Sequence, residues 1–230
     1  MLTEKMTYEE MYRELLEDFV NVERWCFHRG PSLRRTSLHA RTFPQIVRHT
    51  YTSPRKNDWT IIFVIKSKFR NVQDIYNIVF TKLRTSQGDY YLLLHPDVDK
   101  KLRVLVYLPH FMKRYKARTD QSLVGAPLAE RYFLLNDCGT FVDAPDEEFK
   151  RCLCTLEGIV LGEDLNNRMY LCKTFIRYDM SKGWQREAFE NARKKNPLPF
   201  SGGVTVVSGK ESVSATITQT CKEQPKKHIF

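Results

Sequence analysis

Three cationic side chains in the segment HFMKRYKAR have the types and the spacing needed to bind a phosphate group. His110, Arg114 and Arg118 follow one another at four-residue intervals, so in a helix they would lie on one face. Phe111 and Tyr115 have the same spacing and would form a neighbouring stripe that anchors the helix to a core. Two interpretations stay open: the cationic stripe handles phosphate, or it is the solvent-facing side of an ordinary amphipathic helix.

A second group of cations lies further along the chain, in the segment KTFIRYDM. In a strand, Lys173, Phe175 and Arg177 would face one way, because successive side chains alternate between the two faces of a sheet. If this strand packs beside the basic helix, His110, Arg114, Lys173 and Arg177 converge. Such a set suits metal-free RNA cleavage, in which a base takes the 2′-hydroxyl proton, cations stabilise the charge on phosphorus, and an acid protonates the leaving oxygen. Histidine fits the acid or base role and arginine fits the phosphate.

The order of these segments resembles the small toxin-type endoribonucleases of the RelE and BrnT kind. The pattern His-x-x-x-Arg-Tyr-x-x-Arg is followed by EGIVLG and KTFIRYD, all within residues 104–180. In those toxins an H-A-x-x-R-M-x-x-R helix precedes a sheet whose closing strand carries a V-x-T-x-Y-like segment. The resemblance implies endoribonuclease activity, with the catalytic residues His110, Arg114, Arg118, Lys173 and Arg177.

The chain also departs from that pattern. The gap between the helix and the hairpin is much longer than in the compact toxins, and 103 residues precede the similar region. The same region is similar to uncharacterised proteins of bacterial mobile elements and phages, and that similarity implies no activity.

The formal net charge of +10 is concentrated in one segment. Residues 28–57 contain no Asp or Glu, and their cations are Arg29, Arg34, Arg35, Arg41, Arg48, Arg55 and Lys56. A segment of one sign repels itself unless an anionic partner is near, and RNA or another nucleic acid is the commonest such partner. Two alternatives stay open: an acidic protein partner, and a solvated linker whose charge offsets the acidic helix before it.

Several other classes of chemistry lack their sequence signatures. GxGxxG, GxxxxGK[ST], HExxH and GxSxG motifs are all missing from the sequence, which argues against dinucleotide, P-loop, zincin and α/β-hydrolase sites. The close cysteine pair, Cys152 and Cys154, would share one face of a strand, yet no second pair completes four zinc ligands. Buried thiols explain this pair better than a metal, and we expect neither a metal nor a cofactor.

Periodicity and turn residues predict the elements that would position these groups. Helices are expected at 7–22, 72–84, 110–118, 127–137 and 181–195, strands at 59–68, 89–95 and 101–108, and a second hairpin around the turn at 164–167. Residues 29–58 hold Pro31, Pro44 and Pro54 and are expected to be irregular. The sequence therefore predicts an α+β fold, with a mainly antiparallel or mixed sheet built from two hairpins and helices packed on it.

The domain organisation follows from the same elements. We expect an N-terminal helix with a basic irregular extension at 1–58, an α+β core at 59–197, and a tail or edge hairpin at 198–230. Hydrophobic residues make up 42% and charged residues 28% of the chain, as in globular proteins. No apolar run approaches the roughly 20 residues that span a bilayer, and the acidic start does not match a secretory signal. The expected location is the cytoplasm.

Overall fold

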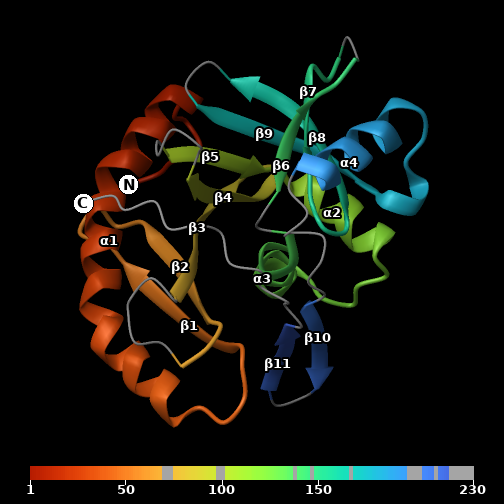
Figure 1. The fold of residues 1–230 in the computed structure, drawn as a ribbon. Coiled ribbons are helices and arrows are strands. Elements are labelled where there is room, and N and C mark those ends of the chain that lie inside the picture. Colours follow the sequence, from red (N-terminus) through yellow and green to blue (C-terminus); the bar gives the residue numbers. More distant parts are fainter. Residues whose placement is uncertain are drawn as a thin grey trace.

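The computed structural model describes residues 1–68, 75–96, 102–136, 139–145, 148–165, 168–195, 204–209 and 212–217. Its main sheet consists of β1 (Gln45–Thr52), β2 (Asp58–Ile65), β3 (Ile75–Thr85), β4 (Gly88–Pro96), β5 (Leu102–Tyr107), β6 (Thr140–Asp143), β7 (Arg151–Cys154), β8 (Gly158–Leu165) and β9 (Met169–Arg177). The spatial order is β1-β2-β3-β4-β5-β9-β8-β7-β6 (Figure 1). Within it, β5 and β9 run parallel and all the other neighbours are antiparallel. Two antiparallel meanders are therefore joined by one parallel pair.

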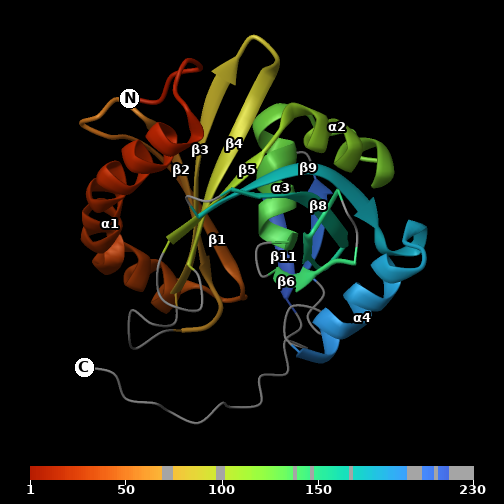
Figure 2. The ribbon, with the colours of Figure 1, turned by 90° about the horizontal axis from the view of Figure 1, so that it is seen from above.

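Helices cover both faces of this sheet. They are α1 (Tyr8–His39), α2 (Pro109–Arg118), α3 (Gly125–Asn136) and α4 (Trp184–Lys195), with a short 3-10 helix η2 (Tyr178–Met180) after β9. Figure 2 shows the sheet bending around α3, with α1 outside its first half and α4 outside its second half. The inner face holds α2 and α3, and this arrangement confirms an α+β fold with a mixed sheet.

The hydrophobic core lies on both sides of the sheet. On the inner side, aromatic residues of α2 and α3 such as Phe111 and Tyr132 pack against Phe175 of β9. On the outer side, Leu15 and Val22 of α1 are buried among residues of β2 to β5. A strand with both faces covered is apolar at consecutive positions, which explains the run WTIIFVI in β2.

The first helix is much longer than predicted. It continues from the expected 7–22 through Pro31 to His39, so the prediction of irregular structure from residue 29 is wrong. Leu33 and Ser37 are buried in this second half, and Leu33 belongs to the outer core between α1 and the sheet. Burial of one helical face outweighs the local preference of a proline to end a helix. Pro31 removes one hydrogen bond, and the packing on both sides of it holds the helix together.

Of the remaining part of the segment predicted to be irregular, residues 40–44 and 53–57 are irregular as predicted, and residues 45–52 form the strand β1 of the sheet. β1 and β2 pair antiparallel along their whole length, from Gln45↔Ile65 to Thr52↔Asp58. The predicted domain boundary at residue 58 therefore falls inside a β-hairpin.

The helix predicted at 72–84 is also wrong, because residues 75–85 form the strand β3. Ile78 and Phe80 point to the inner core, and Val79 and Leu83 point to the outer one. A two-sided apolar strand produces apolar pairs that match helical spacing by chance. The first three residues of the predicted helix lie outside the described part of the chain.

Most other predicted elements are confirmed. The strand β2, the hairpins β4–β5 and β8–β9, and the helices α2, α3 and α4 all lie close to their predicted positions. The sheet contains more than two hairpins, because β1–β3 and β6–β7 add further antiparallel pairs.

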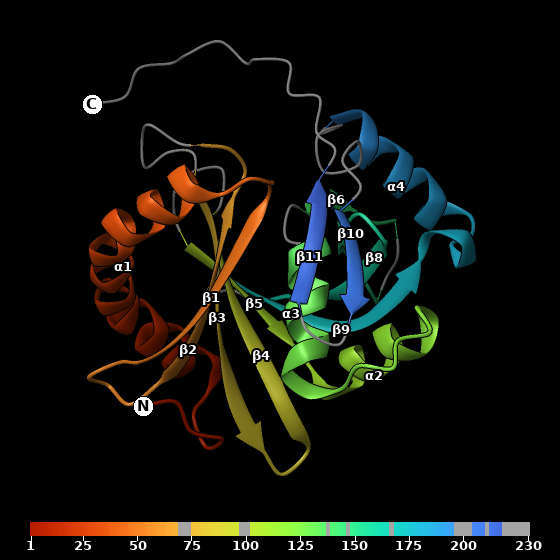
Figure 3. The ribbon, with the colours of Figure 1, turned by 90° about the horizontal axis from the view of Figure 1, so that it is seen from below.

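Within the C-terminal segment predicted as a tail or a hairpin, β10 (Val204–Gly209) and β11 (Ser212–Ile217) form an antiparallel pair. Figure 3 shows this pair beside α3, separate from the main sheet. The remainder of 198–230 lies outside the described residues.

Candidate nucleic-acid interface

A capping box begins α1. The Thr7 hydroxyl accepts a hydrogen bond from the Glu10 amide at 3.2 Å, and the Glu10 carboxylate accepts one from the Thr7 amide at 2.8 Å. This arrangement satisfies amides that the first turn of a helix leaves unpaired. The helix then carries acidic residues in its first half and basic residues in its second. The two halves make different contacts.

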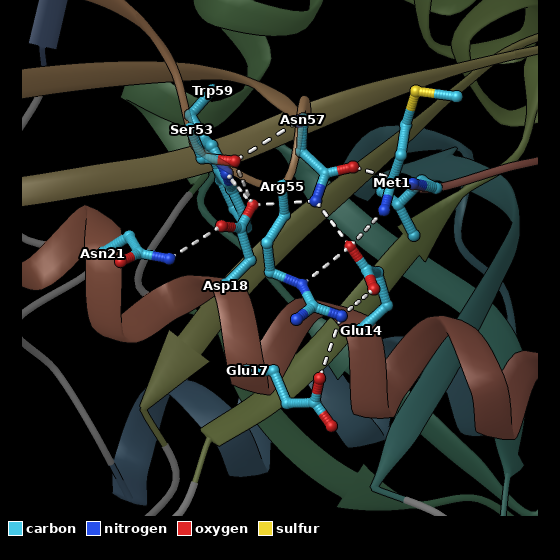
Figure 4. Close-up of polar contacts among 10 residues, drawn as sticks. Met1, Glu14, Glu17, Asp18, Asn21, Ser53, Arg55, Asn57 and Trp59 are labelled. Carbon is cyan, nitrogen blue, oxygen red and sulfur yellow. Dashed lines mark hydrogen bonds and ion pairs between the residues drawn. The ribbon is translucent and has the colours of Figure 1, made fainter.

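In the first half of α1, Asp18 is a buried carboxylate with a complete set of donors (Figure 4). It accepts hydrogen bonds from Ser53 Oγ at 2.7 Å, Asn57 Nδ2 at 2.7 Å and Trp59 Nε1 at 2.8 Å. Burial would raise the pKa of Asp18, but these hydrogen bonds outweigh it and lower the pKa. The turn between β1 and β2 is therefore fixed to the helix by an ionised carboxylate.

Glu14 anchors the same turn through Arg55. The Arg55 Nε donates to Glu14 Oε1 at 3.1 Å, and Asn57 Nδ2 donates to the same oxygen at 3.0 Å. Chiefly because of the Arg55 hydrogen bonds, the pKa of Glu14 falls to about 2 despite its burial. Arg55 also pairs with Glu17 at 2.9 Å. This predicted nucleic-acid-binding arginine is thus neutralised by two carboxylates of α1, although its side chain is partly exposed.

Two other predicted cations lie away from the second half of α1. Arg48 of β1 forms an ion pair with Glu130 of α3 at 2.6 Å. Lys56 is exposed in the β1–β2 turn, where it adopts a φ of 60°. That turn contacts α1 at Asp18, which lies roughly 25 Å from Arg35 at the helical rise of about 1.5 Å per residue.

The second half of α1 presents a cationic outer face. Helical spacing places Arg24, Phe27, Arg34, Arg35 and Leu38 opposite the buried residues of the helix, and all five are exposed. Within the described parts of the chain, the arginines on this face have no hydrogen-bond or ion-pair partner. We call these five residues the α1 outer face. Arg34 and Arg35 are the predicted nucleic-acid-binding residues that belong to it.

The remaining two predicted cations flank this face. Arg29 lies over the Trp25 ring at 4.7 Å, and Trp25 stacks on Tyr51 of β1 at 5.3 Å. Arg41 is exposed just after the helix ends. Beside Trp25, burial and the nearby Arg29 lower the pKa of His49, so its neutral form is favoured on this flank.

The basic helix α2 forms as predicted, and β9 packs beside it. His110 and Arg114 are exposed, and Arg114 Nε donates to His110 Nε2 at 3.2 Å. Arg118 instead donates to the Phe175 carbonyl, and Arg177 donates to the Arg118 carbonyl at 3.2 Å. These two arginines fix the end of α2 to β9.

Lys173 does not converge with this group. The register of β8 with β9 shifts between Leu161 and Gly162, because Leu161 pairs with Thr174 and Gly162 with Cys172, so Lys173 of β9 is a bulged residue without a partner in the strand register. As a result Cys172 and Phe175 both point to the inner core. Lys173 pairs with Glu163 at 2.9 Å, and both charges act on Tyr8 of α1 on the outer side. The predicted shared face of Lys173 and Phe175 is therefore wrong, since alternation holds only in an unbroken strand.

Sequence reasoning missed a polar cluster beneath α2. Glu157, in the turn before β8, accepts hydrogen bonds from Tyr115 Oη at 2.6 Å and Asn136 Nδ2 at 2.8 Å, and pairs with Arg131 at 3.3 Å. Burial and the Glu157 charge raise the pKa of Tyr115. The cluster ties α2, α3 and β8 together. Sequence reasoning also missed Phe27. The helix was expected to end at residue 22, so nothing indicated that Phe27 would lie exposed on it.

Metal sites and membrane spans were searched for in the same described residues. No group of three or more His, Cys, Asp or Glu side chains there could hold a metal ion. Cys152 and Cys154 face the same side of β7, as predicted, and are buried against α4 with free thiols. No helix in these parts is both long enough and apolar enough to cross a membrane.

Comparison of the chain with family models, curated proteins and solved structures finds no match. Function must therefore be argued from the contacts of its own residues.

Proposed function

We propose that this protein binds nucleic acid, RNA in the first place, through the α1 outer face and its flanks. The observation that carries the proposal is the contrast in pairing among the predicted cations. Arg48 and Arg55 are neutralised by Glu130, Glu14 and Glu17, whereas Arg34 and Arg35 have no acidic neighbour in the described structure. Exposed cations placed along one helix attract a polyanion and position its phosphates.

The experiment measures binding of the full chain to labelled RNA and DNA over a range of salt concentrations. Charge reversal in the double variant Arg34→Glu, Arg35→Glu is expected to weaken binding by about 100-fold at low salt and to make the salt dependence shallower, because fewer counterions are released. The matched control is Arg186→Glu, Arg193→Glu, which makes the same charge change at exposed positions of α4. Equal losses in both double variants would show that net charge, and not the α1 outer face, governs binding.

A separate proposal is metal-independent RNA cleavage at His110, which lies on α2 and therefore on the opposite side of the sheet from α1. It is supported by the exposed imidazole of His110, whose Nε2 lies 3.2 Å from the guanidinium of Arg114. Because Nε2 accepts that hydrogen bond, the neutral ring carries its proton on Nδ1. The proposed acid or base is thus His110 with Arg114 as phosphate ligand, while Arg118 and Arg177 position α2.

Cleavage is tested with labelled RNA in the presence of EDTA. His110→Ala is expected to lower the rate by about 100-fold, in the range of a lost general acid or base, while leaving binding nearly unchanged. Lys113→Ala, at an exposed position of the same helix, serves as the control. RNA that stays intact with the unaltered chain would limit the proposal to binding.

A second candidate function is docking of an acidic protein partner on the same helix. The observation that favours it is the exposure of Val20 and Leu38, which are 53% and 52% exposed and align with Phe27 on the α1 outer face. Apolar side chains between cations are typical of protein interfaces. If neither RNA nor DNA binds at low salt, this candidate alone remains.

A further inference from the structure

Phe27 is the most exposed large hydrophobic residue in the described structure, with 77% of its surface accessible. It lies near the middle of α1, between Arg24 and Arg34 on the same face. The ring of His28 contacts it edge-on at a centroid separation of 6.1 Å, and the ring remains open to solvent. An exposed aromatic ring among cations offers a face on which a planar ligand group can stack.

We propose that the ligand of the α1 outer face is a single-stranded nucleic acid, with one base stacked on the ring of Phe27. This inference rests on the proposed function and narrows it to one class of nucleic acid. Surfaces that bind single strands combine cations that follow the backbone with aromatic rings on which bases stack. Phe27 supplies the ring, and Arg24, Arg34 and Arg35 supply the cations.

The geometry favours a single strand over a duplex. In a duplex each base is covered on both faces by its neighbours, so an exposed ring reaches only the base edges. In a single strand the faces of the bases are accessible. From Arg24 to Arg35 the helix extends roughly 16 Å at about 1.5 Å per residue. That length corresponds to about five stacked nucleotides at about 3.4 Å each, so phosphates on both sides of the stacked base can meet an arginine.

The test compares labelled oligo(U) with an RNA duplex of the same length, using the full chain. Phe27→Ala and Phe27→Leu are both expected to weaken oligo(U) binding by about 10-fold, the range of one lost stacking contact. Phe27→Trp keeps an aromatic face and is expected to bind at least as well as the unaltered chain. Because none of these changes alters charge, the salt dependence of binding should stay the same.

Leu38→Ala provides the matched control, since Leu38 is exposed on the same face but has no aromatic ring. We expect this variant to bind oligo(U) within about two-fold of the unaltered chain. A loss as large as that of Phe27→Ala would show that apolar contact with this face, and not stacking on an aromatic ring, contributes to oligo(U) binding, and would overturn base stacking. Unchanged oligo(U) binding by Phe27→Ala, or an equal loss for the duplex, would also overturn it.

The failure of this inference can be told apart from the failure of the proposed function. If Arg34→Glu, Arg35→Glu abolishes binding while Phe27→Ala has no effect, the basic surface stands and the stacking does not. If the duplex binds and oligo(U) does not, the inference fails and nucleic-acid binding remains. Phe27 is mostly exposed, so the variants should melt at the temperature of the unaltered chain, and this measurement checks their folding.

Discussion

Both halves of α1 carry charged side chains, but the fold neutralises those of the first half and exposes those of the second half. In the first half, Glu14 and Asp18 are buried and accept hydrogen bonds from Ser53, Asn57 and Trp59 and from the guanidinium of Arg55. In the second half, Arg24, Arg34 and Arg35 are exposed, and the described residues offer them no acidic partner. A charge that the fold neutralises contributes to stability, whereas a charge that it leaves unpaired is available to a ligand. Net charge alone does not distinguish these two cases.

The largest effect expected from this comparison is on stability, at Asp18. Asp18→Ala leaves the donors of Ser53, Asn57 and Trp59 buried without an acceptor, which should lower the free energy of unfolding by about 3–5 kcal/mol. Denaturant titration measures the change. A loss below about 1 kcal/mol would show that water or a rearranged turn replaces the carboxylate. The hydrogen bonds of the first half of the helix would then contribute little to stability.

A smaller effect is expected from acid. The pKa of Glu14 in the folded protein is about 2, below its ordinary value of 4.5, so its contribution to stability is complete above pH 4.5 and disappears as the pH falls towards 2. The loss should be about 2 kcal/mol. Urea unfolding at about pH 5 and about pH 2.5 measures it, and Glu14→Gln should remove this part of the pH dependence. If the Glu14→Gln variant shows the same pH dependence of the free energy of unfolding, other carboxylates are responsible for it.

The smallest effect is expected in the second half of the helix. Arg34→Ala, Arg35→Ala removes two exposed cations without a partner in the described structure, so the free energy of unfolding should change by less than about 0.5 kcal/mol. Relief of repulsion among the neighbouring cations would make that change slightly stabilising. Thermal melting beside the Asp18→Ala variant gives the direct contrast. A large destabilisation would place these arginines in the structural network and remove the distinction between the two halves.

The sequence predicted elements whose own residues carry a clear helix, strand or turn pattern. α2 and α4 have one buried stripe each, and the paired strands β4 and β5 flank a segment whose composition is typical of turns. It failed where burial on two sides hides the period, as in β3, and where distant packing overrides a local signal, as at Pro31. The residues that cover β3 and those that pack against Leu33 are distant in the sequence, so they cannot be inferred from neighbouring residues.

The candidate site was predicted in part for the same reason. The concentration of cations in residues 28–57 was visible in composition, but their pairing was not, because Glu130 lies 82 positions after Arg48 in the chain. The convergence of Lys173 with His110 failed on a single bulged residue, which no alternating pattern reveals. The endoribonuclease resemblance stays a prediction, and the assay with His110→Ala is its test.

The parallel pair β5–β9 has a consequence for how the protein folds. Val104 pairs with Met169, so this contact forms only after the intervening α2, α3 and three strands have folded back and brought β9 beside β5. Each meander forms between strands that are neighbours in sequence, and such local contacts close with less loss of chain entropy. We therefore expect β1–β4 to gain protection first in pulsed hydrogen exchange and the β5–β9 amides to gain it last. Formation of the β5–β9 pair would then be the rate-limiting step in the folding of the whole sheet.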